Sequence, residues 1–251
     1  MLDVHPPHEA AHTWKDFFIH IITIVIGLLI AIGLEQTVEA IHHRREVQET
    51  REAIQHEREV NRRHFAGATA VFRVETRQLQ TNLAVFRYLA AHPHASPSQL
   101  PGTVNWHSHL PTFSFSAWET AQHDNVTALM PQREVREDEE LYAQLHVVRQ
   151  SYSDRLAASS RARIYMAADA DPTHLSSEQA KEQIKLAEAV LIAEYRLGSD
   201  MRNLHANYID FTPWPTNEEL IRIVHEDSYE TDYMKEMKRI IAPYSDPLEV
   251  P

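Results

Sequence analysis

The sequence predicts an all-α protein with one N-terminal transmembrane helix that continues into a long stalk helix, with a distal helical bundle. Three observations support this fold class. Residues 17–34 form an apolar run, the 55 residues that follow contain no proline and a single glycine, and no stretch alternates long enough to need a sheet. We expect an N-terminal tail at 1–16, a transmembrane helix at 17–34, a polar helical stalk at 35–60, a helical bundle at 61–241 and a loose tail at 242–251.

The composition excludes several kinds of chemistry. There is no cysteine among the 251 residues, so disulfides, thiolate metal sites and a cysteine nucleophile are impossible. The five glycines form no phosphate-binding pattern, and the formal net charge of −12 disfavours nucleic acid as a partner. Serine-hydrolase, zinc-protease and kinase motifs do not occur either. We therefore expect no catalytic residue and no cofactor.

The apolar run has the length of a membrane span. Phe17 to Leu34 reads FFIHIITIVIGLLIAIGL, and its 18 residues cover ~27 Å as a helix, close to the ~30 Å of bilayer hydrocarbon. Its ionisable residue, His20, lies about one turn inside the run, where a neutral imidazole can reach the interface. Two alternatives remain open: a signal peptide cleaved near Ala31-Ile32-Gly33, and a buried core helix of a soluble protein.

Residues suited to lipid headgroups flank the span. The Arg residues that follow it outnumber Lys15 before it, so the positive-inside rule predicts that the C-terminal bulk is cytoplasmic. Within the span, small residues four apart predict close approach to another helix, and hence a homo-oligomer, at Thr23, Gly27 and Ala31. The predicted headgroup residues are Trp14 and Lys15 before the span, and His42, His43, Arg44 and Arg45 after it.

Beyond the span, apolar spacing and helix breakers locate the remaining helices. Large apolar residues recur every seven positions at Phe65, Phe72, Leu79 and Phe86, which indicates that this part of the long helix packs against other helices. Four prolines interrupt residues 92–116, which we expect to form a long loop. A short helix is expected from Ser116, with a capping box of Ser116 and Glu119 and a break at Asp124-Asn125. Two long helices follow, one after Pro131 to Ala170 and one from Ser176 or Ser177 toward Phe211. Two short helices are expected at 218–226 and 229–241.

The 17 histidines raise the question of a metal site. Glu9-x-x-His12 and Glu39-x-x-His42 each match half of a di-iron motif, although the further glutamates of such a site have no evident source. Four histidines share the proline-rich loop and are weak candidates for a divalent metal, against the simpler interpretation that they are ordinary polar loop residues. These four are His92, His94, His107 and His109.

Residues 13–54, the segment FSAWETAQHDNVTALM at 115–130 and the following Leu141-Tyr142 resemble an uncharacterised bacterial family of single-span membrane proteins. The family pairs an aromatic entry and a glycine-containing span with a His- and Arg-rich exit, followed by a tryptophan-led short helix. Asp124-Asn125 stands where its members often carry a glycine turn. The resemblance implies a bacterial inner (plasma) membrane protein, and it implies no catalytic residues.

Taken together, these features predict a membrane-anchored, non-enzymatic interaction or scaffold protein. Its expected partners are the lipid bilayer, a second copy through the membrane helix, and an unidentified protein. A ligand-sensing helical bundle is one alternative, since bundles joined to a membrane helix can bind small molecules. A metal-dependent enzyme using the loop histidines is the other.

Overall fold

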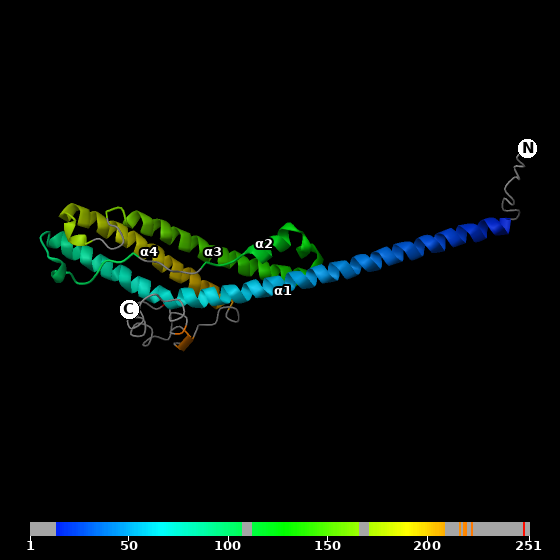
Figure 1. Ribbon diagram of the computed structural model, residues 1–251, viewed down its shortest axis with the longest axis horizontal. Helices are drawn as coiled ribbons and strands as arrows, with labels where there is room; N and C mark the ends of the chain where they lie inside the picture. The colour runs from blue at the N-terminus through cyan, green and yellow to red at the C-terminus, as the bar shows by residue number, and fades with distance from the viewer. Residues whose placement is uncertain are drawn as a thin grey trace, which may run out of the picture.

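The computed structural model describes residues 14–106, 112–165 and 171–208, together with 216, 218, 219, 222 and 248. Over these residues the protein is all-α and contains no strand, which confirms the predicted fold class (Figure 1). The elements with defined bounds are α1 (Trp14–Ala91), η1 (Pro97–Gln99), α2 (Ser116–His123), η2 (Val126–Leu129), α3 (Gln132–Ala162), η3 (Pro172–His174) and α4 (Ser177–Asn207).

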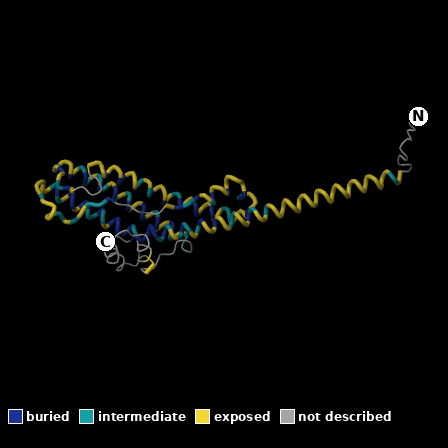
Figure 2. The backbone as a smooth tube through the Cα atoms, viewed as in Figure 1, coloured by how far each residue is buried: buried dark blue, intermediate teal, exposed yellow. Residues whose placement is uncertain are grey.

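One continuous helix, α1, forms both the predicted span and one side of the bundle. Its 78 residues correspond to a length of ~117 Å. No side chain of residues 14–46 is buried, and burial begins at Val47 (Figure 2). The predicted stalk at 35–60 is therefore free of packing only up to residue 46. Sequence reasoning set the boundary too late because the buried residues of α1 before position 60 are Val47, Ile54 and the charged Glu57, which include too few apolar residues to form an evident stripe.

The bundle consists of α1, α3 and α4, and the ion pairs between them define their directions. Arg58 pairs with Asp138 and Glu75 with Arg155, each separated by 80 positions, so α3 runs parallel to α1. Near the far end of α1, the Ser177 hydroxyl donates to the carbonyl of Ala90, which places the start of α4 there. Helix α4 therefore runs antiparallel to α1 and α3.

Parallel α1 and α3 require the chain to return along the bundle between them, and amide side chains of α1 hold this return. The Asn82 side chain donates to the carbonyl of Asn105 and accepts from its N–H. The Asn61 side chain does the same with Ser114. On α1 the two asparagines lie ~32 Å apart, so they hold the return at two well-separated points. Side chains of α1 thus satisfy backbone groups that have no partner in regular secondary structure.

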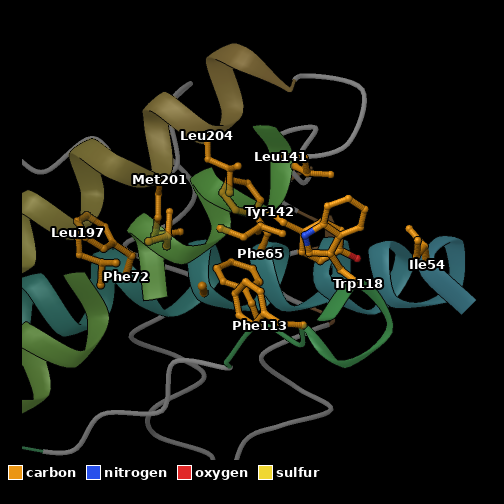
Figure 3. Close-up of a cluster of buried hydrophobic side chains, with 14 of the residues drawn as sticks. Ile54, Phe65, Phe72, Phe113, Trp118, Leu141, Tyr142, Leu197, Met201 and Leu204 are labelled. Carbon is orange, nitrogen blue, oxygen red and sulfur yellow. The ribbon is translucent and has the colours of Figure 1, made fainter. Parts of the chain in front are cut away.

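The predicted heptad stripe forms the core face of α1. Phe65, Phe72, Leu79 and Phe86 are all buried, and Phe65 and Phe72 meet Leu197, Met201 and Leu204 of α4 in one cluster (Figure 3). Gly198 lies beneath the Phe72 ring, and a Cβ added there would overlap that ring. The close packing of α1 against α4 therefore depends on glycine at this position.

The predicted helix caps and the predicted helix break can be compared with the structure; one of these predictions is wrong and two are confirmed. Ser116 is not the N-cap of α2; Phe115 occupies that position and makes no side-chain cap hydrogen bond. The predicted break at Asp124-Asn125 is present, and Asn125 adopts a left-handed conformation with φ of 60°. Ser176 caps α4 through a capping box with Gln179, one of the two caps predicted.

Two other helix predictions differ from the structure or lie beyond it. Helix α3 ends at Ala162, eight residues before the predicted end at Ala170, and no proline or glycine marks this end. After it, the Arg163 guanidinium donates to the carbonyl of Trp106, a tertiary contact that joins the turn to the return segment. The predicted helices at 218–226 and 229–241 lie almost wholly outside the described residues.

Candidate functional site

The first candidate site is the uncovered part of α1, residues 14–46, which we call the arm. It contains the one helical segment among the described residues that is long and apolar enough to cross a membrane, and none of that segment is buried. Exposed side chains such as Ile24 (68%) and Leu29 (62%) make no contact that would shield them from water. Apolar exposure of this extent marks a surface that another apolar phase or another helix covers.

The predicted helix-association residues lie along this arm without any partner from the bundle. An added Cβ at Gly27 would meet nothing within 4 Å. The Thr23 hydroxyl donates to the Ile19 carbonyl at 2.8 Å, so its donor is used within the helix. Thr23, Gly27 and Ala31 are exposed, and their role in helix association stays a prediction.

The predicted headgroup residues also lie on the arm. At its start, the Trp14 ring stacks on Phe17 with 5.5 Å between ring centroids. At the other end, His43 Nε2 lies 3.9 Å from the carboxylate of Glu39, so this glutamate faces His43 rather than the His42 of the half-motif. The other predicted headgroup residues, which are Lys15, Arg44 and Arg45, are exposed.

The structure does not bring the candidate metal ligands together where it describes them. No group of three or more His, Cys, Asp or Glu within the described ranges is placed to hold a metal ion. The His92 ring stacks on Tyr88 at 4.2 Å, with Nδ1 3.0 Å from the Tyr88 carbonyl oxygen, and His94 is exposed. His107 and His109 lie outside the described residues, as does the Glu9-x-x-His12 half-motif.

A second polar cluster lies where the bundle begins and is centred on the buried side chain of Glu57. This carboxylate projects from α1 toward the start of α2, where the first backbone N–H groups of a helix need acceptors. It thereby takes the capping role that sequence reasoning assigned to Ser116. Five donors bond to it: Ser114 Oγ (2.8 Å), Ser116 Oγ (3.1 Å), Ala117 N (2.9 Å), Trp118 N (3.2 Å) and Tyr142 Oη (2.7 Å).

These donors determine the charge of the Glu57 cluster. Burial by itself raises the pKa of the Glu57 carboxyl, but the backbone of Ala117 and the hydroxyls of Tyr142 and Ser114 lower it, and the net pKa is below its ordinary value. The same contact acts oppositely on its partner, because burial and the hydrogen bond to Glu57 raise the pKa of Tyr142. The carboxylate therefore stays ionised and joins α1, α2 and α3.

A third polar cluster lies in the middle of the bundle and takes one residue from each long helix. Arg155 of α3 donates from Nη2 to Glu75 of α1 and from Nε to Glu194 of α4, both at 2.7 Å. All three side chains are at least 93% buried. Arg155 therefore bridges two carboxylates, and among the described residues Glu194 Oε1 and Arg155 Nη1 have no hydrogen-bond partner.

The surroundings of this triad show in the pKa of one member. Burial and the neighbouring negative charge of Glu75 together raise the pKa of Glu194 to about 7, while Arg155 opposes both effects. Buried ion networks of this kind seldom add stability relative to apolar residues, but removing one partner is costly. The triad joins the three long helices, and its side chains are at least 93% buried.

Sequence reasoning missed both clusters, although the signal was present. Glu75 lies three residues after Phe72 and four before Leu79, so it occupies the apolar stripe itself. Likewise, Arg155 continues the spacing of Val148 on α3. A charged residue in register with a core stripe predicts a buried ion pair, but it does not identify the partner.

The bundle gives little room for a small molecule at the cavity beside its main core cluster. This cavity measures about 20 Å³ and lies between α1, α3, α4 and the return segment. Such a volume holds about one water molecule. Its walls include Ala68, Phe113, Val148, Leu197 and Met201 and are almost wholly apolar.

No family model, curated protein or solved structure matches the chain. The resemblance to bacterial single-span membrane proteins therefore stays a prediction, and the functional argument rests on the arm and the bundle.

Proposed function

We propose that this chain is a membrane-anchored scaffold that presents a helical bundle to a protein partner. The observation that carries the proposal is the continuity of α1, in which an exposed apolar segment and a bundle helix share one unbroken rod. No glycine or proline interrupts α1 between residues 34 and 66, so motion of the anchor and motion of the bundle are mechanically coupled.

Anchoring follows from the length and exposure of residues 17–34. A cleaved signal peptide is separated from the mature protein. Here the apolar segment continues in one helix into the core of the bundle, which favours an uncleaved anchor. We assign the chain to a bacterial inner membrane with the bundle in the cytoplasm, on the resemblance and on the excess of arginine after the span. A reporter fused after Pro251 tests the orientation, and reporter activity on the opposite side would reverse it.

Anchoring is tested by extraction of membranes at alkaline pH. We expect the wild-type protein to stay in the membrane pellet and the double variant Val25→Arg/Leu29→Arg to be released, since each arginine at mid-span costs about 2.5–3.5 kcal/mol. The matched control is Gln36→Arg/Ala40→Arg, which adds the same charges at the same spacing outside the span and should stay in the pellet. Release of the wild type, or an intact mass lacking the first 34 residues, would contradict the proposal.

The part of the bundle that we assign to the partner is the outer face of α4. Ile192 and Tyr195 lie one turn apart there, and 69% and 43% of their surfaces are exposed. They are the large hydrophobic side chains of α4 that the described part of the structure leaves exposed. A binding role also accords with the enclosed polar clusters, because neither offers a reactive group to a substrate.

Partner binding is tested by co-purification from native membranes. Ile192→Lys should remove a bound protein without changing the thermal stability of the bundle. Lys185→Glu, an exposed change about two turns before Ile192 and away from the Ile192–Tyr195 pair, should retain it. Equal recovery of the bound protein with both variants would exclude this face of α4.

A further inference from the structure

We propose that the arm of α1 forms a parallel two-stranded coiled coil with the arm of a second copy, and that the seam continues from the span into water. This inference rests on the proposed anchoring, because insertion into one bilayer makes the two arms parallel. It extends the predicted contact at Thr23, Gly27 and Ala31 beyond the membrane.

The arm carries a heptad pattern that does not stop at the end of the span. Ile24, Ala31 and Val38 recur every seven residues at a positions, and Gly27, Leu34 and Ile41 do so at d positions. Apart from Ala40 the other residues of 35–46 are polar, yet 66% of Val38 and 48% of Ile41 are exposed to water. Because a and d positions lie on one face of a helix, Val38 and Ile41 share a face with the small residues Gly27 and Ala31 of the span.

The seam and the bundle lie on nearly opposite sides of α1. At about 100° per residue, the a and d positions centre roughly 150° from the direction of Val47, Arg51 and Ile54, which face η2 and α3. A second arm can therefore approach the seam without meeting α2, η2 or α3 of the first copy. The geometry leaves this side of the arm open for its full length.

The flanking charges identify a second copy as the occupant. In a parallel pair, the g position of one helix meets the e position five residues later in the other. Arg44 lies at g and Glu49 at e, both are exposed, and neither forms an ion pair with another residue that the structure describes. Two copies in register would form the Arg44–Glu49 pair twice, once on each side of the seam.

The apolar seam has a defined end on α1. After Ile41 the next a and d residues along the chain, Arg45 and Gln48, are polar, so the apolar seam ends at Ile41.

Single-cysteine crosslinking tests the seam directly, because the chain has no cysteine of its own. Full-length Val38→Cys and Ile41→Cys, oxidised in membranes, should form disulfide-linked dimers at least about fivefold more than Gln36→Cys and Ala40→Cys. The latter two cysteines lie on the bundle side of the same exposed segment. Equal crosslinking at all four positions, a maximum at 36 or 40, or no dimer would each overturn the proposal.

A charge exchange in the Val38→Cys background tests the register. Arg44→Glu places two like-charged pairs beside the seam and should lower the dimer fraction about three- to tenfold. Adding Glu49→Arg should restore it, because the pairs re-form with reversed sign. Failure of the double exchange to restore the dimer would overturn this register. Failure of anchoring would show separately, as protein absent from the membrane pellet before oxidation.

Discussion

The two halves of α1 have the same backbone and opposite surroundings. Residues 14–46 present apolar side chains with no protein to cover them, whereas from Val47 onward the same helix contributes buried residues to the core. The heptad at Phe65 and Phe72 is covered by α4, while the heptad at Leu34 and Ile41 is exposed. A seven-residue repeat of apolar residues therefore indicates a packing face, but it does not identify the helix or the molecule that covers this face.

The largest expected difference between the halves concerns core truncation. Phe72→Ala should lower the free energy of unfolding by about 3–5 kcal/mol, because it removes a buried ring and leaves a cavity above Gly198. Leu29→Ala, on the arm, should change it by less than about 0.5 kcal/mol. Urea denaturation of both variants in mild detergent, followed by circular dichroism, measures the contrast. Comparable losses would mean that the arm is part of the cooperative unit.

Replacement of Glu57 tests where the arm ends and the bundle begins. Glu57→Gln should cost about 2–3 kcal/mol, since an amide replaces an ionised acceptor for five donors and directs its own N–H groups at some of them. Glu52→Gln, one and a half turns earlier and exposed, serves as the control and should be nearly neutral. The same urea titrations measure both variants. A neutral Glu57→Gln would show that the arm extends past this cluster.

The smallest effect is a pH dependence confined to the bundle. The pKa of Glu194 is raised to about 7 from an ordinary 4.5, so the folded protein retains a proton that the unfolded chain has lost. Its contribution to the free energy of unfolding should therefore fall, on the order of 2 kcal/mol, as the pH rises from about 4.5 to about 7.

Comparison of the wild type with Glu194→Gln isolates this contribution. Glu75 and Arg155 face the same carboxylate, and both are retained in the variant. Unfolding measured at several pH values should show a flatter profile for Glu194→Gln over this range. Parallel profiles for the two proteins would assign the pH dependence to other groups.

Local signals predicted the helices and the core face well. The bundle-facing heptad of α1, the break at Asp124-Asn125 and the cap at Ser176 each depend on neighbours within about two turns, and each is confirmed. The end of α3 at Ala162 was not predictable in this way, because no helix-breaking residue stands there.

The polar clusters show where sequence reasoning stopped. Ser116 and Glu119 match a capping box, but the acceptor for the N-terminus of α2 is Glu57, about 60 positions away along the chain. Similarly, Glu75, Arg155 and Glu194 lie in register with apolar stripes on separate helices, and their spacing does not state which of them meet. Pairings of this kind depend on how the helices are aligned.

The sequence alone determined that the chain is helical, where an apolar segment could enter a membrane, and which chemistry it lacks. These properties follow from composition and from periodicity within a few residues, which act before any long-range contact forms. Only the tertiary structure decided that α1 and α3 are parallel, that Glu57 caps α2, and that burial begins at Val47. Those features depend on contacts between residues far apart in the chain, which short-range patterns do not encode.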